Sequence, residues 1–229
     1  MNKRLLTIMS LIENGKGIID VGTDHGYIPI ALAQQGYCGK IFASDINRGP
    51  LDSAIKNAKE SKMEDKIQFL LCDGLVLCPY EEIDTIVIAG MGGDMICKIL
   101  DYAEWIMDPA YKLILQPMTK QEILRYWLSN NGFETEREEL AVEGDQIYQI
   151  LSVRFGGETK YSDAELYVGK KTLNKDRETY VHLIKRTEKR FIKVIADMES
   201  SKRALTSQWK FYEKILSDLK EMGKNYDAC

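Results

Sequence analysis

Long apolar runs and closely spaced cysteines are missing from this sequence. No stretch approaches the roughly 18 uninterrupted apolar residues that a membrane-spanning helix needs. The opening segment "MNKRLLTIMSLIENGKG" has neither a long apolar core nor a small-residue cleavage site, so we expect no secretory signal. The cysteines are odd in number, show no metal-ligand spacing and indicate reduced thiols in a cytoplasmic protein. They are Cys38, Cys72, Cys78, Cys97 and Cys229.

The composition is ordinary for a globular protein, but the charge is unevenly distributed. The chain has 229 residues, enough for one sizeable α/β domain and an appendage. Residues 158–229 contain 16 Lys and Arg against 12 Asp and Glu, whereas residues 1–157 contain 15 against 23. An anionic partner is therefore expected to bind the tail.

Strand-like and helix-like segments alternate through the first half of the chain. The predicted strands are "GIIDV", "KIFASD", "KIQFLLCD", "DTIVIAG" and "YKLILQP", with helical patterns between them. This alternation predicts a mostly parallel sheet covered on both faces. Residues 133–155 instead read as two strands around a turn at 143–145, which predicts a terminal antiparallel hairpin.

The tail has the pattern of two helices. Apolar side chains recur at heptad-like spacing, which predicts an antiparallel helical coiled coil. The expected contact positions are Tyr180, Ile184, Thr187, Phe191, Val194 and Met198, followed by Leu205, Gln208, Tyr212, Ile215, Leu219 and Met222.

The turn after the first strand lacks the glycines of a dinucleotide-binding loop. In G-x-G-x-x-G counted from Gly22, the second and third glycines fall on Asp24 and Tyr27. The segment fits acid-x-Gly-x-small-x-Gly better, with Asp20, Gly22, Asp24 and Gly26. A carboxylate there disfavours phosphate and favours a cationic ligand, and S-adenosylmethionine fits. The alternative is a plain turn in which Asp24 caps the next helix.

Three further strand ends carry polar or glycine-rich chemistry. Asp45 is placed to accept hydrogen bonds from a ribose diol, or to cap a helix. Asp73, beside Gly74, is placed to hold an adenine amino group, or is a turn residue. The segment "IAGMGGD", with Gly90 and Met91, leaves room beside the main chain. All four ends lie on the carboxyl edge of the predicted sheet, where open α/β sheets bind ligands.

Several stretches carry a family resemblance over nearly the whole chain. They are "KRLLTI", "DVGTDHGYIPI", "ASDINRGPLDSA", "CDGL", "DTIVIAGMGGDMI", "LILQPM" and "EGDQIYQILSV". With them the sequence resembles the bacterial tRNA (adenine-N1)-methyltransferases that modify position 22. Two positions depart from the family pattern. Met118 stands where Asn is usual and cannot hydrogen-bond the target base as Asn could, and Gln149 stands where Glu is usual.

The resemblance implies a Rossmann-like class I methyltransferase sheet of seven strands over residues 1–157. It also implies a C-terminal helical coiled coil that binds tRNA over residues 158–229, and S-adenosylmethionine as cofactor. The expected cofactor-binding residues are Asp20, Gly22, Asp24, His25, Gly26, Asp45, Ile46, Asp73, Gly74, Gly90 and Met91.

For the chemistry, N1 of a neutral adenine has an in-plane lone pair and needs no deprotonation, so positioning dominates. Asp24 and Asp94 are candidates to stabilise the cationic product, although Asp94 also suits a helix cap. Tyr27, Gln116 and Pro117 are candidates to shape the base pocket. His25 is more readily a packed turn residue than a proton carrier.

For tRNA, six basic residues of the tail share one side of a predicted helix, which suits phosphate contacts; a solvated helix face is the alternative. Arg4 is a further candidate, for tRNA or the cofactor carboxylate. We expect no membrane and no obligate protein partner. A methyltransferase for another RNA or a small molecule, or a non-catalytic binding protein, are the competing functions. The six residues, called the basic stripe below, are His182, Lys185, Arg186, Lys189, Arg190 and Lys193.

Overall fold

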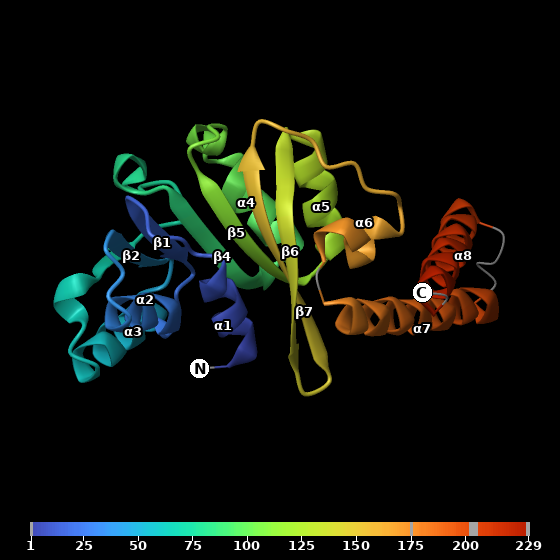
Figure 1. The fold of residues 1–229 in the computed structure, drawn as a ribbon, viewed down its shortest axis with the longest axis horizontal. Helices are drawn as coiled ribbons and strands as arrows, with labels where there is room; N and C mark the ends of the chain where they lie inside the picture. Colours follow the sequence, from blue (N-terminus) through green and yellow to red (C-terminus); the bar gives the residue numbers. More distant parts are fainter. Residues whose placement is uncertain (1, 175, 202–205, 228–229) are drawn as a thin grey trace. The chain divides into compact units, whose positions relative to one another are not determined.

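The computed structural model describes residues 2–174, 176–201 and 206–227 (Figure 1). The chain forms two compact units, Met1–Thr159 and Lys160–Cys229. Among the residues described, no helix is both long and apolar enough to cross a membrane.

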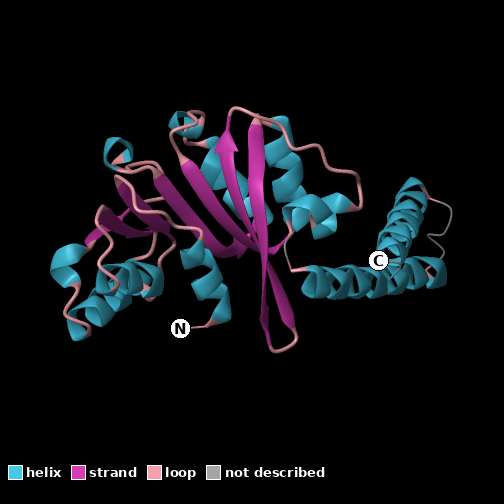
Figure 2. Cartoon of the chain, in the orientation of Figure 1, coloured by secondary structure: helices cyan, strands magenta, loops and turns pink. Residues whose placement is uncertain are grey.

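The first unit is built on a seven-stranded sheet in the order β3-β2-β1-β4-β5-β7-β6 (Figure 2). The first five strands pair in parallel, β7 is antiparallel to β5, and β6 is antiparallel to β7. The predicted fold class, with its terminal hairpin, is therefore confirmed. The strands are β1 (Gly17–Val21), β2 (Lys40–Asp45), β3 (Gln68–Leu71), β4 (Thr85–Gly92), β5 (Lys112–Thr119), β6 (Phe133–Glu143) and β7 (Gln146–Phe155).

Helices cover both faces of this sheet because its strands alternate between two apolar layers. In β4, Ile86 and Ile88 pack with the side chains of α4 (Gly93–Asp101) and α5 (Gln121–Asn130). Val87 points to the other layer, with α1 (Lys3–Ser10), α2 (Tyr27–Gln34) and α3 (Arg48–Glu60). Three single turns of 3-10 helix complete the unit: η1 (Glu64–Lys66), η2 (Tyr80–Glu82) and η3 (Glu104–Ile106).

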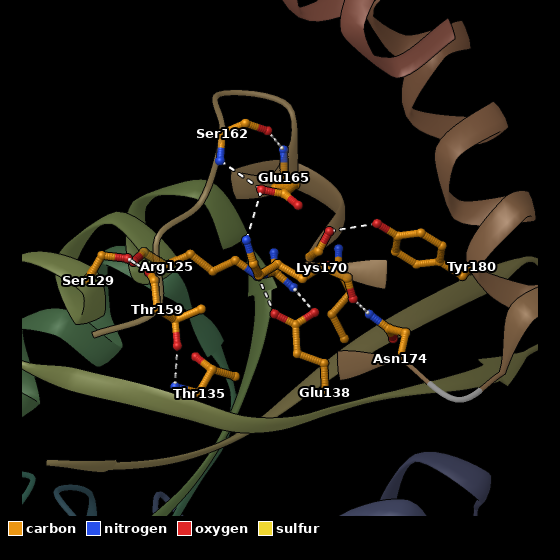
Figure 3. Close-up of polar contacts among 12 residues, drawn as sticks. Arg125, Ser129, Thr135, Glu138, Thr159, Ser162, Glu165, Lys170, Asn174 and Tyr180 are labelled. Atoms are coloured by element: carbon orange, nitrogen blue, oxygen red, sulfur yellow. Dashed lines mark hydrogen bonds and ion pairs between the residues drawn. The ribbon is translucent and has the colours of Figure 1, made fainter. Parts of the chain in front are cut away.

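A buried ion pair ties α5 to the hairpin (Figure 3). Arg125 is 0% exposed, and its Nε and Nη2 atoms lie 3.1 and 3.2 Å from the two carboxylate oxygens of Glu138. Nη2 also donates to Oε1 of Gln149 at 2.7 Å. Gln149, which stands where the family usually has Glu, thus accepts a hydrogen bond from a guanidinium whose charge Glu138 already balances.

The second unit consists of α6 (Glu165–Val168), η4 (Lys171–Leu173), α7 (Arg177–Ser200) and α8 (Ser207–Asp227). The sequence did not predict α6 and η4. Asp176 caps α7 by accepting from the Thr179 N–H at 3.0 Å. The hydroxyl of Tyr180, which is labelled in Figure 3, donates to the Gly169 carbonyl at 2.7 Å.

The helices α7 and α8 run antiparallel along a shared apolar seam. Tyr212 meets Phe191, with ring centroids 5.5 Å apart, and Gly223 lies against Ile184, so later residues of α8 meet earlier residues of α7. Two buried positions of α7, Leu183 and Ile195, were missed by the predicted spacing.

On α8, Leu216 is also buried, whereas Gln208, predicted in the seam, is exposed. That prediction is wrong: Gln208 donates to the Tyr212 hydroxyl at 3.0 Å instead of packing. Leu205, predicted to begin the second series, and Cys229 lie outside the described residues.

Candidate active site

A tight turn joins β1 to α2 at the carboxyl edge of the sheet. Gly22, Asp24 and Gly26 all have left-handed backbone conformations, with φ of 71°, 51° and 71°. A Cβ at Gly22 would collide with the Met91 methyl group, so the turn lies directly against the carboxyl end of β4. The N-cap of α2 is Gly26, without a side-chain bond, so the alternative of Asp24 as a helix cap is wrong.

The first of two cavities opens beside this turn and has a volume of about 280 Å³. Asp20, Gly22, Thr23 and Asp24 line it from the turn, and Tyr27 follows from α2. Arg4 from α1 and Met118 from the end of β5 also line it. Residues far apart in the sequence are therefore brought together around a pocket with two carboxylates and one guanidinium.

Asp20 gives this cavity its electrostatic character. Burial raises the pKa of Asp20 to about 6 and the neighbouring Asp45 adds to the rise, whereas a hydrogen bond from Thr23 and the charge of Arg4 oppose it. The Thr23 hydroxyl donates to Oδ2 of Asp20 at 2.7 Å. Above that pKa the cavity holds a carboxylate that is costly to bury, and a cationic ligand relieves the cost.

The second cavity, of about 370 Å³, lies along the ends of β2, β3 and β4. Asp45, Ile46, Asp73, Gly74 and Met91, all of them predicted to bind the cofactor, line it together. Gly22, Ala89 and Gly90 line both cavities, so the two spaces adjoin over main chain.

The lining of the second cavity also suits an adenosine group. Asp45 is buried, and its Oδ1 accepts from the Asn47 N–H at 2.8 Å, which leaves Oδ2 available to a ribose diol. The N-cap of α3 is Asn47, so Asp45 does not cap that helix. The residues present therefore fit the two halves of S-adenosylmethionine, a neutral adenosine and a cationic methionine.

Gln116 lies beneath the first cavity and is fully buried. Its Oε1 accepts from Arg4 Nη1 at 2.7 Å and from the Gly90 N–H at 3.2 Å, and its Nε2 donates to the Pro117 carbonyl at 2.9 Å. With its amide used in this way, Gln116 holds Arg4 and Gly90 in place. We therefore interpret it as a positioning residue and not as a wall of the base pocket.

Four other predicted residues lie outside the linings of both cavities. His25 is half-exposed, with Nε2 3.6 Å from Oδ2 of Asp24. Gly26 lies against Ala54, and Pro117 pairs with Met91 in the sheet. Asp94 is bound by Lys120 at 2.6 Å, and the hydrogen bond from Lys120 holds the pKa of this carboxyl below its ordinary value.

Asp94 does not cap α4 either, because the N-cap of that helix is Gly92. Among the residues that line the first cavity, the sequence did not predict a role for Leu5, Thr23, Ile28 or Ala89. Thr23 could have been predicted, because its hydroxyl comes three residues after a buried acid.

The basic stripe lies on α7 in the second unit. All six of its side chains are exposed, and the buried residues of the seam lie on the opposite side of the helix. The Arg190 guanidinium carbon lies 5.4 Å from the centre of the Tyr167 ring of α6, a cation–π contact that orients it. These positions are compatible with phosphate contacts.

Comparisons with known proteins agree with this geometry. A family model described as "Methyltransferase domain" matches residues 1–151. A tRNA (adenine(22)-N(1))-methyltransferase of Bacillus subtilis is 31% identical over 156 residues, which cover 68% of this chain and 66% of that protein. The aligned segment thus spans about two thirds of the curated relative.

Solved structures extend the likeness to nearly the full chain. A Streptococcus agalactiae protein of the NADB-Rossmann superfamily has a TM-score of 0.84 at 30% identity, with 97% of each chain covered. The TrmK protein of M. capricolum, solved with S-adenosyl-homocysteine, has a TM-score of 0.77 at 26% identity, covering 99% of this chain and 98% of that one. The chain therefore belongs to the tRNA (adenine(22)-N1)-methyltransferase family of S-adenosylmethionine-dependent methyltransferases.

Proposed function

We propose that this protein methylates N1 of the adenine at position 22 of tRNA, with S-adenosylmethionine as the methyl donor. The observation that carries the proposal is the pair of adjoining cavities over Gly22, Ala89 and Gly90. One suits an adenosine group, and the other combines two carboxylates with an exposed aromatic ring. The Bacillus subtilis relative, 31% identical over 156 residues, is named for the same reaction.

The second cavity would hold the adenosine part of the donor. Asp45 accepts from the ribose diol, and Asp73 with the Gly74 backbone meets the adenine edge. Asp20 attracts the positive charge of the methionine part, and the guanidinium of Arg4, which Gln116 holds in place, suits its carboxylate. Bound there, the donor supplies an electrophilic methyl group on a sulfonium, and its transfer leaves S-adenosyl-homocysteine and a cationic 1-methyladenine.

The first cavity would receive the methionine part of the donor and, beside it, the target base. Tyr27 is 56% exposed and Met118 44%, so both offer apolar surface to a base taken out of its stack. The N1 lone pair reacts without a general base, so these residues work by orienting the ring and excluding water. Asp24 stabilises the positive charge that develops on the ring.

The second unit would bind the tRNA backbone. The basic stripe makes phosphate contacts, which fix the position of the substrate without reading its sequence. We assign residues 1–157 to catalysis and residues 158–229 to this binding. We also propose a cytoplasmic location, because a bacterial enzyme meets its tRNA there.

A tritiated-methyl assay on unmodified tRNA tests the proposal, with nucleoside analysis of the product. We expect 1-methyladenosine from a tRNA with adenine at position 22 and none from the same tRNA with guanine there. Asp45→Ala removes a charged acceptor and is expected to weaken S-adenosylmethionine binding by about 100-fold, measured by calorimetry. Methylation of another atom or another RNA would refute the assignment.

A further inference from the structure

A third hollow, distinct from the two cavities, lies between α2 and α3. This groove has a volume of about 430 Å³, within the range of small-ligand sites. Ile30 and Gln34 line it from α2, and Asn57, Glu60 and Ser61 line it from α3. Tyr27 lines both the groove and the first cavity, so this one side chain separates them.

The lining combines an apolar floor with neutral polar edges. Tyr27, Ile30 and Ala31 supply apolar surface, and Gln34 and Ser61 supply an amide and a hydroxyl. Asn57 donates through Nδ2 to the His25 carbonyl at 2.9 Å, which leaves its side-chain oxygen for a ligand donor. The groove lining contains no Lys or Arg, and Glu60 is acidic. A flat ring with amino groups on its edge fits this chemistry, and a phosphate does not.

We propose that this groove binds the nucleobase next to the target adenine in the tRNA strand, stacked on Tyr27. The inference rests on the proposed function and extends it to a second subsite. Extracting one base leaves its neighbour with an uncovered face, and an aromatic side chain restores stacking to any base. The neighbour is covalently tied to the base in the first cavity, so it is the group that must lie across Tyr27.

The rim of the groove agrees with a passing nucleotide strand. Lys56 is exposed on α3, one turn before Glu60, and its Nζ lies 3.9 Å from the Glu60 carboxylate. A pair at that separation on a solvated surface is weak. Lys56 can therefore turn to a backbone phosphate while Glu60 accepts from a base amino group.

Filling the groove tests the proposal without touching Tyr27. Gln34→Phe fills it from α2 and Ser61→Phe from α3. Gln35→Phe is the matched control, because Gln35 is exposed and adjacent to Gln34 but does not line the groove. We expect both fillers to raise KM for tRNA about tenfold relative to the control, with kcat within about twofold and S-adenosylmethionine affinity unchanged.

A modified substrate identifies the occupant. Synthetic tRNAs lacking the base on the 5′ or the 3′ side of the target adenine are compared with intact tRNA. On one of these two abasic tRNAs, the parent enzyme is expected to show a kcat/KM about tenfold lower than on intact tRNA. On that same tRNA, Gln34→Phe and Ser61→Phe are expected to show no decrease beyond the loss that they already show on intact tRNA. If Gln34→Phe and Ser61→Phe match the control, or if their losses add to those of both abasic tRNAs, the groove is not this subsite.

The parent enzyme is first assayed on intact tRNA. Absence of 1-methyladenosine at that stage would refute the proposed function itself, whereas its presence with unaffected fillers would refute the subsite alone. The folding of each variant is checked by thermal unfolding.

Discussion

Four charged residues of the first unit are buried, whereas the basic stripe of the second unit is exposed on α7. The buried residues are Asp20, Asp45, Arg125 and Glu138. A buried charge needs an opposite charge, from the protein or from a ligand, to offset its desolvation. The sheet holds these buried charges in one geometry. Exposed charges cost the fold little and are accessible to a polyanion. The first arrangement suits a small donor, and the second suits a long backbone.

The largest effect on folding is expected from breaking the buried pair. Arg125→Met removes the guanidinium that pairs with Glu138 in the interior, so the free energy of unfolding should fall by about 3–5 kcal/mol, as measured by urea unfolding. The double variant Arg125→Met with Glu138→Leu should recover most of that loss. A single variant as stable as the parent would show that this pair is not buried as described.

A smaller and pH-dependent effect is expected from Asp20→Asn. The folded pKa of Asp20, about 6, is raised above its ordinary value, so the parent keeps this group's full stability only at low pH and loses it as the pH rises through 6. Without ligand, the variant should be more stable than the parent by up to about 3 kcal/mol at pH 8, and the difference should vanish near pH 4.

Asp20→Asn should also weaken S-adenosylmethionine binding. The substitution removes the buried negative charge that destabilises the protein without ligand and attracts the cationic ligand. Urea unfolding at pH 4 and pH 8 measures the stability difference, and calorimetry at pH 8 measures the affinity for S-adenosylmethionine. A stability difference that does not change with pH would contradict the assignment.

A charge reversal on α7 should barely change folding. Replacing Lys185, Arg186, Lys189 and Arg190 by Glu is expected to alter the free energy of unfolding by less than about 1 kcal/mol, because all four side chains are exposed. The same variant should bind tRNA about 100-fold more weakly, with its affinity for S-adenosylmethionine intact. Equal tRNA affinity for variant and parent would remove the stripe from the binding surface.

Added salt should leave the fold unchanged and separate the two binding modes. Raising the salt concentration from about 50 to 200 mM should weaken tRNA binding at least tenfold, because phosphate contacts release counterions. S-adenosylmethionine binding in its buried site should change less than about twofold. Filter binding measures the affinity for tRNA, and calorimetry measures the affinity for S-adenosylmethionine. If the two affinities depended equally on salt concentration, the contrast between exposed and buried charges in the two units would be contradicted.

Much of the first unit was readable from the sequence because its signals are local. Alternating apolar residues predicted strands such as β4, and acids at strand ends predicted which positions would gather at one edge. The role of Gln116 was not readable, because it depends on Arg4 reaching it from a helix 112 positions earlier. The groove beside Tyr27 was equally hidden, because it forms only when α2 and α3 lie together.

In the second unit the strict heptad was the source of error. A helix with 3.6 residues per turn drifts away from a 3.5-residue repeat, so Leu183 and Ile195 enter the seam while Val194 and Met198 are only half-buried. Helices as short as α6 leave too few residues for a periodic pattern to be recognised.

The floor between the two cavities is main chain, and this has a consequence for inhibitors. A Cβ at Gly22 would strike Met91, and Gly90 has a φ of 82° that other residues rarely adopt. A compound spanning both spaces would therefore rest on atoms that point mutations can hardly alter. Resistance mutations would have to change side chains of the outer walls. A compound that does not contact those side chains would leave few positions at which resistance could arise.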